Sequence, residues 1–122
     1  MNGIKYLVDT NCFIYLLDEN PIILPFINSG WAFSYITEME LLSKKGMSTN
    51  EDSLTREMLN SCYKINHSQS ITELVINLRR NHNIKLPDAI IAASAQLLRL
   101  PVITADKTFA RFTDIDCIIL DF

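Results

Sequence analysis

The sequence predicts an α/β fold, a three-layer α/β/α sandwich around a central, mainly parallel sheet of about four to five strands. Short hydrophobic runs bounded by turn residues alternate along the whole chain with segments of helical periodicity. One helical segment near the C-terminus is rich in alanine, which is typical of a helix that packs closely on a sheet. Strands that alternate with helices pair in parallel and carry helices on both faces.

The first third of the chain supplies two strands and two helices. Ile4–Asp9 is an apolar run that predicts a buried strand, and Thr10–Asp18 has apolar residues at helical spacing. Pro21 and Pro25 punctuate a second, short helix. Trp31–Ile36 alternates aromatic and smaller residues, which predicts the second strand.

The middle of the chain continues this alternation. Thr37–Lys45 is expected to be a helix stopped by Gly46, and Ser53–Ser61 a further helix. Tyr63–Asn66 is short and apolar enough for a third strand.

The last third holds the most distinctive helix. Ser70, with Glu73 three residues later, has the spacing of a capping box and predicts a helix start. Leu86–Leu100 is expected to be a helix because Pro87 suits a first helical turn and small residues follow. The remaining expected elements are a strand at Val102–Thr104, a short helix at Thr108–Phe112 and a strand at Cys117–Leu120.

Length and composition limit the class of protein. With 122 residues, of which 48% are apolar, the chain is expected to form one domain over residues 1–122. Its apolar runs are far shorter than the roughly 20 residues of a membrane span, and no secretory signal is visible, so we expect a cytoplasmic protein without membrane contact. The three cysteines are odd in number and far apart, which predicts reduced, buried thiols rather than disulfides or a zinc site.

Several chemistries are excluded or poorly supported. With only three glycines the chain contains neither a P-loop nor a G-x-G-x-x-G turn. His67 and His82 lie in polar segments and are expected at the surface, and no serine lies in a G-x-S-x-G elbow, so a triad hydrolase is not indicated.

Four carboxylates stand where strands end or helices are expected to begin: Asp9, Glu40, Asp88 and Asp106. Ligands of open α/β sheets collect outside the carboxyl ends of the strands, where such residues meet. Four acids at one place repel one another unless a cation lies among them. Carboxylate oxygens are the ligands that Mg²⁺ and Mn²⁺ prefer, so we expect a site for one of these ions.

Each acid also has a purely structural interpretation. Glu40 fits a capping box with Thr37, and Asp88 in a first turn favours the helix dipole. Asp9 and Asp106 are suitable N-caps for the helices that follow them. Any one acid is explained as well by these roles as by metal binding, but four acids at successive sheet-to-helix junctions favour a shared site.

Basic residues close in sequence to these acids are candidates for binding a phosphate backbone, although an isolated basic pair is usually a solvated helix face. A net charge of −3 is unusual for a passive nucleic-acid binder, but bound divalent ions would offset several negative charges. The candidates are Lys85, Lys107 and Arg111.

Four segments, in order, resemble the successive motifs of PIN-domain ribonucleases, most closely the VapC-type toxins of toxin/antitoxin pairs. They are V-D-T-N at Val8–Asn11, S-Y-I-T-E-M-E-L at Ser34–Leu41, L-P-D-A-I-I-A-A at Leu86–Ala93 and I-T-A-D-K-T-F at Ile103–Phe109. The third segment is the most specific. The resemblance selects Glu40 over Glu38, and it departs from the family at Ala105, where many relatives carry a polar residue.

The resemblance implies a metal-dependent endoribonuclease that leaves a 3′-hydroxyl and a 5′-phosphate. Asp9 and Asp88 would be the principal Mg²⁺ or Mn²⁺ ligands, with Glu40 and Asp106 completing the catalytic set directly or through water. Residues that would orient these ligands or a bound water are Thr10, Asn11 and Thr104.

The family also implies partners: an RNA substrate of the tRNA or rRNA class, a second copy in a homodimer, and a cognate antitoxin. Apolar residues at helical spacing offer material for an antitoxin groove, or equally for ordinary core packing. They are Phe13, Leu17, Ile22, Ile23 and Phe26.

Other classes fit less well. A receiver domain needs adjacent acids after its first strand, and a haloacid-dehalogenase-type phosphatase needs D-x-D-x-T, whereas here Thr10 and Asn11 follow Asp9. A PIN-like scaffold that binds protein or RNA without cleaving it is the remaining alternative.

Overall fold

Five strands form one sheet in which every pair of neighbours runs parallel, in the order β3-β2-β1-β4-β5. This is a computed structural model, and it describes residues 3–121. The strands are β1 (Ile4–Val8), β2 (Gly30–Ser34), β3 (Tyr63–Ile65), β4 (Val102–Thr104) and β5 (Cys117–Ile119). The predicted α/β fold class is confirmed.

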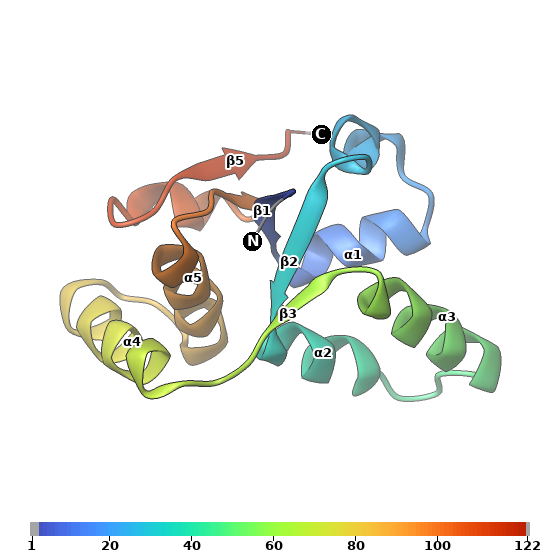
Figure 1. The fold of residues 1–122 in the computed structure, drawn as a ribbon, viewed down its shortest axis with the longest axis horizontal. Helices are drawn as coiled ribbons and strands as arrows, with labels where there is room; N and C mark the ends of the chain where they lie inside the picture. Colours follow the sequence, from blue (N-terminus) through green and yellow to red (C-terminus); the bar gives the residue numbers. More distant parts are fainter. Residues whose placement is uncertain (1–2, 122) are drawn as a thin grey trace.

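Helices cover both faces of the sheet. They are α1 (Thr10–Leu17), α2 (Tyr35–Leu42), α3 (Thr49–Asn60), α4 (Gln69–Asn81) and α5 (Leu86–Leu98), with short 3-10 helices η1 (Pro21–Phe26) and η2 (Lys107–Arg111). Figure 1 shows α4 and α5 on one side of the sheet, α1 and α3 on the other, and α2 below the end of β2. Helix α2 therefore lies at the carboxyl edge of the sheet, where β1, β2 and β4 end.

The core is divided by the sheet into two layers. Successive side chains of a strand point to opposite faces, so Leu7 belongs to the cluster beneath α4 and α5 while Val8 belongs to the cluster beneath α1 and α3. Both side chains are fully buried. Burial on two faces explains why the end of β1 and the whole of β4 are buried at successive positions rather than at every second one.

Helix α5 packs closely on its neighbours, as its composition predicts. Ala89, Ala92 and Ala93 are fully buried, and small side chains let a helix backbone approach a sheet. The helix ends at Leu98 rather than at the predicted Leu100, because Arg99 adopts a left-handed conformation as its C-cap.

The junction between β2 and α2 differs from the prediction. The strand ends at Ser34 and the helix begins at Tyr35, two residues before the predicted Thr37. The Ser34 side chain accepts a hydrogen bond from the Ile36 N–H at 3.3 Å and caps the helix.

Two further helix starts were predicted too late. Helix α3 begins at Thr49, not at Ser53, because Ser48 and Glu51 form a capping box. Helix α4 begins at Gln69 and is capped by Ser68, so the predicted capping box of Ser70 and Glu73 is wrong. Helix η2 covers Lys107–Arg111 instead of the predicted Thr108–Phe112, and α2 ends at Leu42, three residues before the predicted Lys45. The strand at Val102–Thr104 has the predicted bounds, and the remaining boundaries agree with the predictions to within two residues.

In residues 3–121 no helix is long and apolar enough to cross a membrane. The cysteines are unpaired, as predicted, but only Cys12 is buried; Cys62 and Cys117 are partly exposed. The start of the chain, on which the absence of a secretory signal was judged, lies partly outside the described residues.

Candidate metal centre

Two of the predicted acids meet because their strands are neighbours. Val8 at the end of β1 pairs with Ile103 of β4, and the Asp9 N–H donates to the Ile103 carbonyl at 2.9 Å. Asp9 is the first residue after β1, and Asp106 follows β4 by two residues. Parallel strands therefore carry both carboxylates to the same edge.

Asp9 is the most buried of the four acids, with 5% of its surface exposed. Its Oδ1 accepts from the Thr10 N–H at 2.8 Å, and its Oδ2 accepts from the Thr104 hydroxyl at 2.6 Å and from the Asn11 amide at 3.4 Å. Burial raises the pKa of Asp9, while the Thr104 hydrogen bond opposes that rise. The Asp9 carboxylate is thus held in place from two sides.

Thr104 connects Asp9 to Asp106. Its hydroxyl donates to Asp9 and accepts the Asp106 backbone N–H at 3.0 Å. Asp106 caps η2 through Oδ1, which accepts from the Thr108 N–H at 2.9 Å and the Thr108 hydroxyl at 2.7 Å. The capping roles considered for Asp9 and Asp106 are thus both present, alongside their position at the shared edge.

Glu40 reaches the site from within α2 rather than from its start. It is the sixth residue of that helix, so the expectation that it opens a helix, in a capping box with Thr37, is wrong. Its Oε1 instead accepts from the Thr10 hydroxyl at 2.7 Å. This bond links α2 to the residue next to Asp9.

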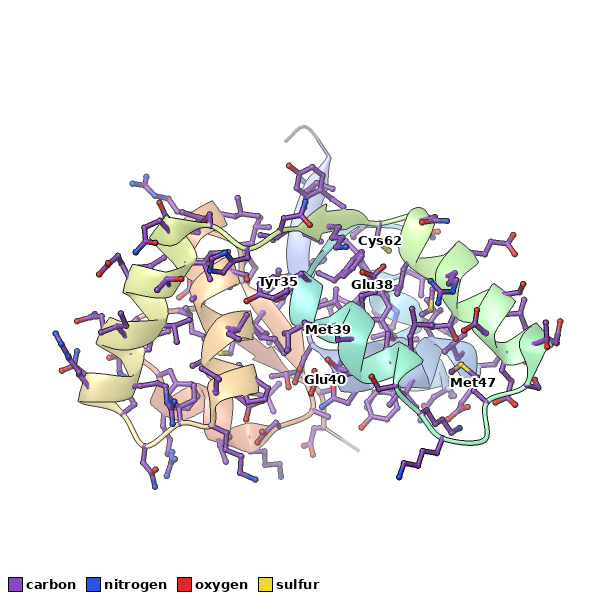
Figure 2. The ribbon with its side chains drawn as sticks, turned by 90° about the horizontal axis from the view of Figure 1, so that it is seen from below. Tyr35, Glu38, Met39, Glu40, Met47 and Cys62 are labelled. Atoms are coloured by element: carbon purple, nitrogen blue, oxygen red, sulfur yellow. The ribbon has the colours of Figure 1, made fainter. Side chains whose placement is uncertain are left out.

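Glu38 and Glu40 lie on different sides of α2, as Figure 2 shows. Glu38 accepts from Lys64 of β3 at 2.7 Å. The structure therefore separates the two glutamates and leaves only Glu40 beside Thr10 and Asp9.

Asp88 lies in the first turn of α5 and is affected by all three other acids. Partial burial, and then the negative charges of Asp9, Asp106 and Glu40, raise its pKa to about 6, while Lys85 opposes the rise. The four carboxylates thus share one electrostatic field. Their hard oxygens match the preference of Mg²⁺ and Mn²⁺, although within residues 3–121 no three Asp, Glu, His or Cys side chains are arranged closely enough to hold an ion.

A cleft of about 270 Å³ opens beside Asp88 and Asp106. Lys85 and Arg111 line it together with these two acids. Lys107, the third basic residue considered for substrate, is exposed and is not part of its lining. The cleft therefore places two positive side chains beside the part of the sheet edge that carries Asp9, Glu40, Asp88 and Asp106, which we call the acidic edge.

Histidines and cysteines take no part in this cluster. His67 is exposed and is 2.8 Å from the Thr72 hydroxyl, and His82 is partly buried, 3.5 Å from Asp114. The expectation of a surface position is thus right for His67 and only partly right for His82. Burial raises the pKa of Cys12 to about 12, which makes this thiol inert as a nucleophile.

A second hollow, of about 460 Å³, lies between α1, α2 and α3 and reaches Thr10 and Glu40. Its exposed apolar lining is supplied by Ile14, Leu17 and Leu54. Of the five residues considered for a partner groove, only Leu17 lines it. Phe13 and Ile23 are buried in the core, and Ile22 and Phe26 pack against that core.

Sequence reasoning missed Thr37. This residue is fully buried, and its hydroxyl lies 3.0 Å from the Thr10 hydroxyl. The available signal was its spacing of three residues from Glu40, which puts both on one face of a helix.

The family model of the PIN domain matches residues 6–115, and a search of curated protein sequences found no significant match. One chain of a toxin-antitoxin complex from Klebsiella pneumoniae is 34% identical with a TM-score of 0.84, over 96% of this chain and 98% of that one. DNA-bound VapBC from Salmonella typhimurium is 20% identical with a TM-score of 0.83 (97% and 99% covered). VapBC2 from Rickettsia felis, bound to a promoter DNA fragment, is 22% identical with a TM-score of 0.78 (97% and 100% covered).

The all-parallel sheet carries acids at its carboxyl edge, and the PIN-domain family model matches most of the chain. Together these findings define the class of protein. The chain belongs to the PIN-domain family. Within that family, the resemblance to VapC-type toxins predicted from the four motifs is confirmed.

Proposed function

We propose that this chain is a Mg²⁺- or Mn²⁺-dependent endoribonuclease that acts as the toxin of a toxin/antitoxin pair in the cytoplasm, with residues 1–122 forming one nuclease domain. The observation that carries the proposal is the shared field of the four carboxylates, which raises the pKa of Asp88 to about 6. Such a cluster is costly in the absence of a cation and well suited to holding one.

Asp9 and Asp88 would be the principal ligands, with Glu40 and Asp106 completing the site directly or through water. A divalent ion held there would supply a water of lowered pKa and neutralise charge on the phosphoryl oxygens. Thr104 and Asn11 hydrogen-bond to Asp9, and Thr10 hydrogen-bonds to Glu40, so these residues would orient the two carboxylates at the carboxyl edge of the sheet.

The cleft beside Asp88 and Asp106 suits the RNA backbone. Lys85 and Arg111 would bind phosphates of the RNA backbone, because both line the cleft next to Asp88 and Asp106. Lys107, which is exposed, would contribute attraction at longer range.

The hollow between α1, α2 and α3 suits an antitoxin segment. Ile14, Leu17 and Leu54 are 45%, 40% and 49% exposed and would receive the apolar face of a helix. Because this hollow ends at Glu40 and Thr10, a bound segment would also cover the acidic edge. This geometry supports inhibition by occlusion.

A further apolar face supports the homodimer. A hollow of about 610 Å³ along α4 and α5 is lined by Tyr35, Ile76 and Leu86, among other residues. Ile76 and Leu86 are 39% and 48% exposed, and large exposed apolar patches mark interaction surfaces. We assign this face to the second copy.

The test is incubation of purified protein with tRNA and rRNA in Mg²⁺ or Mn²⁺, beside the Asp9→Asn variant. Asparagine still caps α1, so the variant is expected to fold and to lose cleavage at least a hundredfold. Products ending in 3′-hydroxyl and 5′-phosphate are expected, and a 2′,3′-cyclic phosphate would contradict the mechanism.

Two other results would change the assignment. Equal cleavage by the wild type and Asp9→Asn would identify a contaminating nuclease. Tight RNA binding without cleavage in either metal would favour the alternative of a PIN-like binding scaffold.

A further inference from the structure

We infer that Thr37 is a positioning residue: its buried hydroxyl orients Thr10, and through Thr10 it holds the Glu40 carboxylate ready for a metal ion. The inference rests on the proposed metal-dependent function. It concerns a contact between α1 and α2 that no single sequence motif contains, because Thr10 and Glu40 are 30 residues apart.

Two hydrogen bonds link Thr37 to Thr10 and Thr10 to Glu40, and we call this chain the relay. Counting protons gives the direction of donation along it. A carboxylate can only accept, so in the 2.7 Å contact the Thr10 hydroxyl is the donor to Glu40 Oε1. A hydroxyl carries one proton, which leaves Thr10 able only to accept in its 3.0 Å contact with Thr37. The Thr37 proton therefore points at Thr10, and the order of donation is Thr37 to Thr10 to Glu40.

Burial makes this direction stable. Thr37 is 0% exposed, so water does not compete for its hydroxyl. Thr37 and Glu40 are three residues apart on α2 and lie on one face of that helix, which points both at the first turn of α1. Successive hydrogen bonds in such a chain polarise and strengthen one another.

The relay occupies only one of the two Glu40 oxygens. Oε1 accepts from Thr10, while within residues 3–121 no hydrogen bond to Oε2 is formed, so that oxygen is available to an ion or its water. The same first turn of α1 follows Asp9, whose Oδ1 accepts the Thr10 N–H. Thr10 therefore orients Asp9 through its backbone and Glu40 through its side chain, and Thr37 fixes the rotamer of Thr10.

The test compares Mn²⁺ affinity, by calorimetry without RNA, with thermal stability in Thr37→Val and Thr37→Ser. Valine keeps the shape and removes the hydroxyl, and we expect Mn²⁺ to bind about tenfold more weakly. Serine keeps the hydroxyl and removes a buried methyl group, so we expect a lower Tm with Mn²⁺ affinity within about threefold of the wild type. Thr55→Val is the matched control, because Thr55 is buried but donates to the Glu51 carbonyl of its own helix.

A double-mutant cycle separates the relay from a general packing effect. Thr10→Val removes the donor to Glu40, so adding Thr37→Val to it should weaken Mn²⁺ binding no further. The inference would be overturned if folded Thr37→Val bound Mn²⁺ with wild-type affinity. It would also be overturned if Thr37→Val weakened Mn²⁺ binding as much in the Thr10→Val background as in the wild type. Either result would leave the proposed metal site intact. Absence of Mn²⁺ binding by the wild type would overturn the proposed metal site, and the inference with it.

Discussion

At the scale of single residues, the carboxylates of the acidic edge lower the stability of the metal-free fold because they repel one another. The pKa of Asp88 is raised from 3.8 to about 6 by partial burial and by the charges of Asp9, Asp106 and Glu40. Between these two values the folded chain binds a proton more tightly than the unfolded chain does. The resulting stabilisation is present below pH 4 and is lost as the pH rises through 6.

Asp88→Asn should therefore stabilise the metal-free protein at pH 7. Because Asp88 is partly exposed, solvent screening limits the gain to about 1 kcal/mol, or about 4 °C in Tm. Thermal unfolding in EDTA at pH 3.5, pH 5 and pH 7 measures it: the gain should fall to roughly half at pH 5 and vanish at pH 3.5, where Asp88 is protonated in both the folded and the unfolded chain. The exposed Asp121→Asn is the control, and an equal gain there would mean that only net charge matters.

Thr104→Val tests how Asp9 is kept ionised. The Thr104 hydroxyl donates to Asp9 at 2.6 Å and lowers the pKa of that buried carboxyl. Its removal should move the acidic limb of the cleavage-rate profile to higher pH and reduce kcat by roughly 10- to 100-fold. Thr113→Val, at an exposed position, should leave the profile unchanged; an unshifted limb in Thr104→Val would contradict this role.

At the scale of elements, what could be predicted follows from how local each signal is. The position of Asp9 after β1 was predictable because an apolar run followed by a capping residue is contained in a few neighbouring positions. The start of α2 was not predictable from the sequence, because two helix starts fit it equally well. Thr37 and Glu40 have the spacing of a capping box, and Ser34 is a suitable single N-cap. In the folded chain the Thr10 hydroxyl donates a hydrogen bond to Glu40, so the Glu40 side chain does not cap the helix. This contact joins residues 30 positions apart and is made only on folding.

The cap of α2 should matter for function as well as for stability. Ser34→Ala removes the acceptor for the Ile36 N–H, which should cost about 1 kcal/mol. It should also weaken Mn²⁺ binding, because α2 carries Glu40. Ser48→Ala removes the cap of α3 at a similar cost but lies outside the helix that carries Glu40. Calorimetry that finds the two variants equal in Mn²⁺ affinity would show that α2 is held by its other contacts.

At the scale of the whole molecule, the two apolar hollows lie on different helices and so can be tested separately. The face along α4 and α5 is proposed for the second copy. Ile76→Glu, at a 39% exposed position in that hollow, should convert a dimer to a monomer in light scattering. Leu97→Glu, at 40% exposure on α5 but outside the hollow, should remain dimeric. A dimeric Ile76→Glu would place the interface elsewhere.

The hollow between α1, α2 and α3 is proposed for the antitoxin, and Leu54→Glu tests it. A buried, unpaired carboxylate there should weaken binding of the co-expressed cognate antitoxin by more than a hundredfold. Cleavage by the isolated variant should stay at the wild-type rate, because Leu54 belongs to α3 and not to the acidic edge. Leu24→Glu is the control, since Leu24 is 57% exposed and does not line this hollow. Because the hollow ends at Glu40, loss of binding and loss of inhibition should occur together. Antitoxin binding by Leu54→Glu that is as tight as in the wild type would place the antitoxin segment elsewhere on the chain.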